Sequence, residues 1–103
     1  MLIGLPKEIK NNEFRVGLIP TSVSELVKSG HQVLVQSGAG AGIGAADAAY
    51  QAAGAMISPT AEQVFQDAEM IVKVKEPQKQ EWAQLASHQI LFTYLHLAAD
   101  VAQ

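Results

Sequence analysis

The chain has 103 residues, of which 49% are hydrophobic, and it carries a net charge of −3 and no cysteine. This size and composition predict one domain with a packed core and argue against intrinsic disorder. The acidic balance argues against nucleic acid or an anionic membrane as a partner, and the lack of cysteine excludes disulfides and cysteine metal sites. No basic leader precedes the short apolar start of the chain, so we expect a cytoplasmic protein.

Apolar runs of strand length alternate along the chain with segments whose apolar residues recur at helical spacing. Ser22 and Glu25 predict a capping box at the first helix, and Gly30 fits the residue after its end. In chain order the pattern predicts a strand over 2–5, a helix over 22–29, a strand over 32–36, a helix over 47–53, a strand over 55–58, a helix over 61–68, a strand over 70–74, a helix over 78–86 and a strand over 89–93.

This alternation of strands and helices predicts an α/β fold with a parallel sheet covered on both faces. The strands are continuous apolar runs, as expected when burial on both sides removes polar alternation. We therefore expect a doubly wound, Rossmann-like or flavodoxin-like sheet. Only three residues follow Asp100, a possible helix cap. Since one isolated turn of helix is unstable, we expect either a fragment of a longer domain or a frayed end.

A long charged connection lies between Pro6 and Pro20, where α/β units usually have loops of about 2–6 residues. Because it leaves the carboxyl end of the first strand, it is a candidate binding loop. It contains Arg15, the only arginine of the chain. Arginine suits bidentate recognition of a carboxylate or phosphate, and the alternative is an ordinary surface charge.

The glycine-rich stretch Gly38–Gly44 follows a predicted strand and precedes a short predicted helix. Its register Gly40-x-Gly42-x-x-Ala45 partly matches the dinucleotide-binding fingerprint. However, no acidic residue ends a following strand at the expected distance, because Glu62 begins a helical segment. The alternative is a turn whose glycines need positive φ angles.

Lys75 and His96 each follow an apolar strand. Carboxyl ends of parallel strands share one edge, where open α/β sheets bind ligands. Lysine can offset negative charge on a carbonyl oxygen, and imidazole can move protons near neutral pH. The alternatives are a solvated lysine and a structural histidine. The residues alone therefore predict a site for a small anionic carbonyl compound, held by Arg15 and Lys75, with His96 moving protons and with no metal.

Two stretches, MLIGLPKEIKNNEFRV (1–16) and KSGHQVLVQSGAG (28–40), resemble the N-terminal region shared by alanine dehydrogenases and the α-subunits of proton-translocating nicotinamide nucleotide transhydrogenases. Two more, MIVKVKEP (70–77) and LFTYLHLAAD (91–100), are similar to L-alanine dehydrogenases in particular. The transhydrogenases lack a lysine and a histidine at the places of Lys75 and His96. The resemblance covers essentially the whole chain.

The resemblance implies that L-alanine, NAD and water are converted to pyruvate, ammonia and NADH. It implies that residues 1–103 are the N-terminal part of the substrate domain. Arg15 matches the arginine that holds the substrate carboxylate, Lys75 the lysine that contacts the carboxylate and carbonyl oxygen, and His96 the catalytic acid/base. NAD would be bound by a separate Rossmann domain absent from this chain, which supports a turn at Gly38–Gly44.

The resemblance also implies a homo-oligomer. We expect the chain alone to be inactive, because hydride transfer needs the nicotinamide placed against the substrate carbon. Two alternatives stay open. One is a fragment of a transhydrogenase α-subunit, and the other is a non-enzymatic, truncated module that binds a keto acid or a partner subunit.

Overall fold

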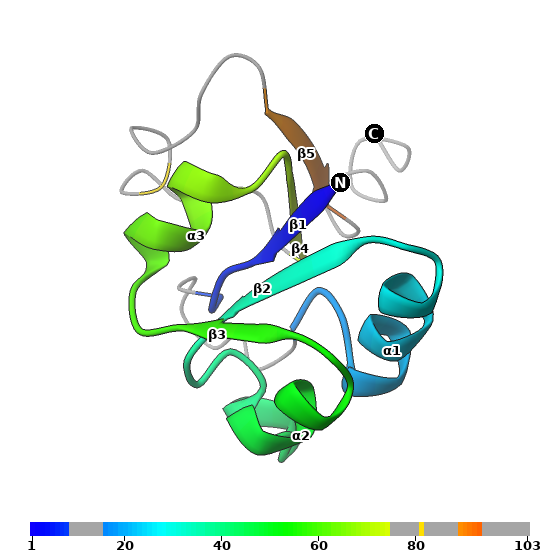
Figure 1. Ribbon diagram of the computed structural model, residues 1–103. Helices are drawn as coiled ribbons and strands as arrows, with labels where there is room; N and C mark the ends of the chain where they lie inside the picture. Colours follow the sequence, from blue (N-terminus) through cyan, green and yellow to red (C-terminus); the bar gives the residue numbers. More distant parts are fainter. Residues whose placement is uncertain (9–15, 75–80, 82–88, 94–103) are drawn as a thin grey trace, which may run out of the picture.

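The computed structural model describes residues 1–8, 16–74, 81 and 89–93. Of the predicted elements, the helix over 78–86 lies outside the described residues except for Glu81. The described elements are β1 (Leu2–Leu5), α1 (Pro20–Lys28), β2 (Gln32–Gln36), the 3-10 turn η1 (Ala41–Ile43), α2 (Asp47–Ala52), β3 (Met56–Ser58), α3 (Ala61–Asp67), β4 (Met70–Lys73) and β5 (Ile90–Thr93), as Figure 1 shows.

The strands form one sheet in the order β3-β2-β1-β4-β5, and every neighbouring pair is parallel. From β1 the chain builds outward through β2 to β3, and it then crosses to the other side of β1 to add β4 and β5. This reversal of direction defines a doubly wound sheet, with its topological switch point between β1 and β4. The predicted parallel α/β fold is confirmed.

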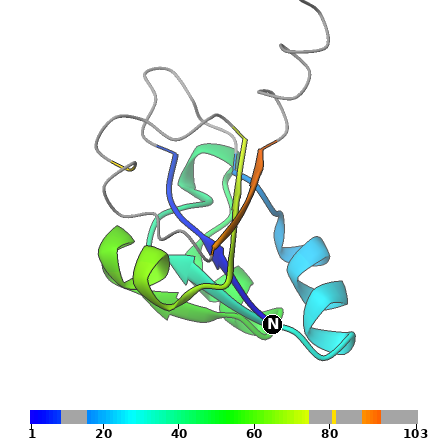
Figure 2. The ribbon, with the colours of Figure 1, turned by 90° about the horizontal axis from the view of Figure 1, so that it is seen from above.

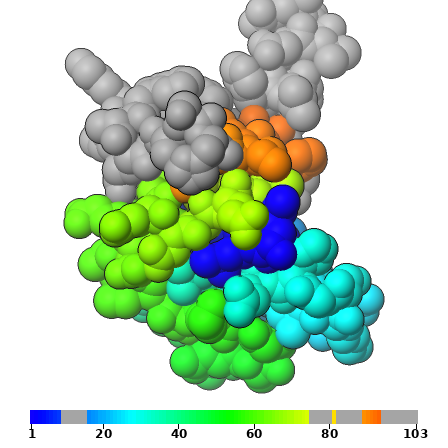
Figure 3. Space-filling view, turned by 45° about the horizontal axis from the view of Figure 1, so that its top comes forward, coloured from blue at the N-terminus to red at the C-terminus, as the bar shows by residue number. Residues whose placement is uncertain are grey.

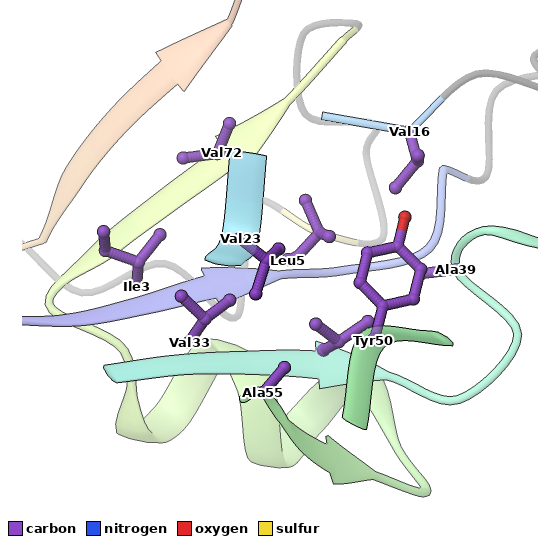
Figure 4. Close-up of a cluster of buried hydrophobic side chains, with 10 residues drawn as sticks. Ile3, Leu5, Val16, Val23, Val33, Ala39, Tyr50, Ala55 and Val72 are labelled. Atoms are coloured by element: carbon purple, nitrogen blue, oxygen red, sulfur yellow. The ribbon is translucent and has the colours of Figure 1, made fainter. Parts of the chain in front are cut away.

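Helices cover both faces of the sheet. Helices α1 and α3 lie on opposite sides (Figures 1 and 2), and α2 packs on the α1 side through the buried ring of Tyr50. Alternate residues of the strands point to opposite faces of the sheet and lie in two separate hydrophobic cores, as expected for strands buried on both faces. Figure 4 shows the first core, built around Ile3, Leu5, Val23, Val33, Val35, Tyr50 and Val72, and the second contains Leu34, Val64, Phe65, Ala68 and Ile71.

Gly4, in the middle of β1, lets helix α3 approach the sheet closely. A Cβ atom at this position would lie 2.6 Å from the Ala68 Cβ and 2.9 Å from the Val64 Cγ1. Both neighbours belong to the second core and are fully buried. The absence of a side chain at Gly4 is therefore part of the packing between β1 and α3.

The predicted capping box at α1 is wrong. The helix begins at Pro20 with Ile19 as its N-cap, no side chain caps it, and Ser22 lies within its first turn. Proline suits this start, because its missing N–H would have no helical partner there and its φ is already helical. The other end is as predicted: Gly30 follows the C-cap residue Ser29 with a φ of +96°.

The glycine-rich loop after β2 is closed by Asp47, the first residue of α2. One carboxylate oxygen of Asp47 accepts a hydrogen bond from the Ser37 hydroxyl (2.6 Å), and the other accepts one from the Gly38 N–H (2.9 Å). The Ser37 hydroxyl, followed by the Gly38 N–H, holds the pKa of Asp47 below its ordinary value. Gly38 and Gly44 have φ angles of +81° and +76°, which confirms the predicted turn.

Strand β5 forms one edge of the sheet and is poorly covered by the described residues. Ile90, Leu91 and Phe92 are 49%, 37% and 43% exposed. Figure 3 shows the atoms of β5 at the surface beside those of β4. In the part of the chain that the structure describes, no helix has the length and apolarity needed to cross a membrane.

Gly4→Ala tests the close packing of α3 on β1. The added methyl group overlaps two buried side chains, so we expect a loss of about 1–3 kcal/mol in the free energy of unfolding, as overpacking usually costs. Urea denaturation measures it. Gly42→Ala is the matched control, because Gly42 is exposed and has no positive φ. Equal stability of both variants would contradict this packing.

Asp47→Asn tests the closure of the glycine-rich loop. A carboxyl whose pKa is lowered by folding stabilises the protein above its unfolded pKa, near 3.8, and this stabilisation is lost as the pH falls through the folded value. We therefore expect the variant to be less stable than the unaltered chain at pH 7, with the difference shrinking below about pH 4. Urea midpoints across this range measure it. Ser37→Ala should show a weaker form of the same trend, and a pH-independent difference would contradict it.

Candidate functional site

The carboxyl ends of β1 and β4 meet at the switch point of the sheet. The two strands are direct neighbours, with Gly4 opposite Ile71. The next strand after β1 is β2 and the next after β4 is β5, so the chain continues from these two neighbours toward opposite edges of the sheet. In open α/β folds this divergence produces the place where ligands bind.

A buried ionic cluster lies at this point. Lys73, the last residue of β4, is only 1% exposed, and its Nζ lies 3.2 Å from the Glu8 Oε1 and 3.1 Å from the Glu81 Oε2. Glu8 and Glu81 are 7% and 2% exposed. Because an unpaired buried charge is strongly unfavourable, the ammonium and the two carboxylates depend on one another. These three residues are called the Lys73 cluster below.

Glu8 also holds the backbone beyond β4. Its second oxygen, Oε2, accepts a hydrogen bond of 3.1 Å from the N–H of Val74. On the other side, the N–H of Lys7 donates to the side-chain oxygen of Gln36 at the end of β2, at 2.8 Å. The chain leaving β1 is thus joined to the ends of both neighbouring strands.

The chain returns to the same strand after the long connection. Val16 is buried in the first core, and Figure 4 shows it beside the hydroxyl of Tyr50. Gly17 packs so closely on β4 that a Cβ atom there would lie 2.7 Å from the Val72 carbonyl oxygen. The hydroxyl of Tyr50 donates to the carbonyl of Leu18 at 2.8 Å, and burial raises the pKa of this hydroxyl. Both ends of the 9–15 connection are therefore fixed against β4.

Strand β5 ends level with β4, because Thr93 is the register partner of Lys73. Thr93 is buried, unlike the other three residues of its strand. The carboxyl ends of β1, β4 and β5 therefore lie along one edge, as the sequence predicted.

The three predicted site residues, Arg15, Lys75 and His96, lie outside the described residues. Their neighbours in the chain are described: Val16 directly follows Arg15, Val74 directly precedes Lys75, and Thr93 is three residues before His96. The assignment of these three residues as substrate-binding and catalytic stays a prediction.

Sequence reasoning missed the Lys73 cluster. Lys73 lies in the predicted strand over 70–74 and Glu8 in the long charged connection, and the sequence pattern does not predict a contact between them. The available signal was a lysine inside the apolar run Met70–Val74, since a buried ammonium needs a carboxylate partner. The sequence could not say which of the ten acidic residues supplies it.

The glycine-rich loop does not fit a dinucleotide. The Gly38 N–H, which a phosphate oxygen would need, donates to the Asp47 carboxylate, and helix α2 has only six residues. A carboxylate at this place would also repel a pyrophosphate. Among the residues described, no group of three histidine, aspartate or glutamate side chains could hold a metal ion.

Comparisons with known proteins agree with this architecture. An alanine dehydrogenase from Bacillus subtilis is 55% identical over 100 residues, which are 97% of this chain and 26% of that protein. A solved L-alanine dehydrogenase is also 55% identical and superposes with a TM-score of 0.89, over 96% of this chain and 27% of its own. A transhydrogenase from Sinorhizobium meliloti is 33% identical with a TM-score of 0.84, over 90% and 27% of the two chains.

This chain spans about a quarter of the length of these relatives. The model of the family described as "Alanine dehydrogenase/PNT, N-terminal domain" matches residues 4–103. The match covers the end of β1, the whole of β4 and the whole Lys73 cluster. The chain therefore belongs to the alanine dehydrogenase/PNT N-terminal domain family.

Proposed function

We propose that this chain carries the substrate-binding part of an NAD-dependent L-alanine dehydrogenase, which interconverts L-alanine and pyruvate with ammonia. Membership of the family and the 55% identity to alanine dehydrogenases support the reaction class. The glycine-rich loop does not fit a dinucleotide, so we place the NAD site in another part of a longer polypeptide.

The observation that carries the proposal is the convergence of strand ends at the switch point. Glu8 and Gly17, which flank the connection containing Arg15, both contact the end of β4. Lys75 continues from that end, and His96 continues from the neighbouring β5, whose last residue is level with Lys73. Three segments with complementary chemistry thus start from one edge.

Each of the three side chains would act on a different group of a 2-keto acid. The Arg15 guanidinium can hold the carboxylate through two parallel hydrogen bonds. The Lys75 ammonium can donate to the carbonyl oxygen and offset the negative charge that develops on it. The His96 imidazole can take up and return a proton near neutral pH.

Two alternatives make different predictions. A transhydrogenase fragment is less consistent with the 33% identity to the transhydrogenase and with the presence of Lys75 and His96. A non-enzymatic module would bind a keto acid or a partner without ever supporting turnover.

A pyruvate titration of the isotope-labelled chain, followed by NMR, tests the proposed site. We expect saturable shifts at Val16, Val74 and Thr93, the described neighbours of the three site residues. Lys75→Ala should weaken binding at least about tenfold, because it removes a charged hydrogen-bond donor. Lys28→Ala, at the end of α1, is the control and should bind as the unaltered chain does. No shifts in a folded chain, or equal effects of both variants, would contradict the site.

The oxidation of NADH by pyruvate and ammonium tests whether this chain binds the substrate while a separate portion binds NAD. We expect no turnover from the 103-residue chain, because hydride transfer needs a nicotinamide placed against the substrate and we assign NAD binding to another part of the polypeptide. Activity should appear when a separately produced NAD-binding portion is added and should be lost with His96→Ala. Saturable, His96-dependent turnover by the chain alone would contradict the proposal that NAD binds to a separate portion. Failure of every mixture would favour the non-enzymatic alternative.

A further inference from the structure

We propose that Glu8 is a positioning residue for the substrate site, acting through the backbone at the end of β4. The inference rests on the proposed function for the identity of the ligand, a small 2-keto acid. Its structural basis is separate: one carboxylate binds a buried ammonium with one oxygen and a backbone N–H with the other.

The two contacts of Glu8 lie next to both predicted binding segments. Oε2 holds the N–H of Val74, the residue directly before Lys75. Glu8 is itself the residue directly before the connection that ends in Arg15. A shift of this carboxylate would therefore displace the starting points of both segments together.

Lys73 gives the carboxylate its fixed position. Its ammonium is almost fully buried and bridges Glu8 to Glu81. A freely rotating surface glutamate would hold the Val74 N–H more weakly, because ordering its side chain would offset much of the gain. A buried partner at 3.2 Å removes that freedom, and hydrogen bonds to charged groups are stronger than neutral ones.

The two contacts of Lys73 make a clean variant possible. Its ammonium is paired with both Glu8 and Glu81. Glu8→Gln leaves Lys73 paired with Glu81, so the variant does not leave this buried ammonium without a carboxylate. Glutamine keeps the size of the side chain but loses the charged acceptor at Val74.

Glu69→Gln is the matched control. Glu69 also accepts a backbone hydrogen bond, from the N–H of Leu2 at 3.2 Å, but at the amino end of β1 and on the protein surface. The Glu69→Gln variant makes the same chemical change next to the same two strands, but at the end of the strands away from the proposed site.

The experiment combines amide hydrogen exchange with pyruvate titration of the labelled 103-residue chain and both variants. We expect Glu8→Gln to speed exchange at Val74 by about tenfold or more, with exchange at Ile71 unchanged, and to raise the Kd for pyruvate by a similar factor. Glu69→Gln should match the unaltered chain in both measurements. A merely structural role would instead speed exchange throughout the core.

Unchanged exchange at Val74 would overturn the inference, and so would an unchanged Kd in the variant. If the unaltered chain binds no pyruvate, the proposed function is contradicted, and exchange at Val74 still decides whether Glu8 fixes the strand end. If Glu8→Gln does not fold, Glu8→Asp replaces it. That variant keeps the charge for Lys73, and its shorter side chain withdraws from Val74, so the same two expectations apply.

Discussion

The interaction on which the edge of this sheet depends is the burial of one lysine between two carboxylates. Lys73 ends the strand that lies beside β1 at the switch point, and its partner Glu8 lies in the chain that leaves β1. The register pairs between β1 and β4 are Ile3 with Met70 and Gly4 with Ile71, before the end of either strand. Beyond these pairs a side-chain cluster holds the exits of the two strands together, with a charged hydrogen bond to Val74 added.

Such a cluster is not an obvious source of stability. Hydrophobic residues of similar volume often serve a buried position as well as an ion pair does, because both ions lose their hydration. Charges do have geometric demands, however: each oxygen of Glu8 has a defined partner, whereas an apolar contact tolerates sliding. A site that must hold a carboxylate and a carbonyl at fixed places needs that kind of definition.

The rest of the fold brings the chain to this edge. Gly4 lets α3 lie close to β1, and Gly17 lets the returning connection lie against β4. Tyr50 reaches across the first core to hold the carbonyl of Leu18. Each of these contacts joins segments distant in sequence, and together they limit where the long connection can begin and end.

The order of strands and helices could be predicted from the sequence, because the spacing of apolar residues and the positions of glycines at element ends are local signals. Strand 32–36 was predicted to the residue, and β4 and β5 differ from prediction by one residue at one end. The start of α1 was misread since Ser22 and Glu25 imitate a capping box, while the Pro20 start was overlooked. The Lys73 cluster was beyond prediction because Glu8 and Lys73 are 65 residues apart and meet only once the strand order is fixed.

The most direct test of whether the Lys73 cluster holds the strand ends together is the free energy of unfolding of Lys73→Met. It is measured by urea denaturation for Lys73→Met alone and for the same substitution combined with Glu8→Gln and Glu81→Gln. Removing only the ammonium takes the cation of this cluster away from two buried carboxylates, so we predict a loss of about 3–5 kcal/mol. Neutralising both carboxylates in the same chain should recover most of that loss. If Lys73→Met alone costs less than about 1 kcal/mol, as for an exposed ion pair, the cluster does not hold the strand ends together.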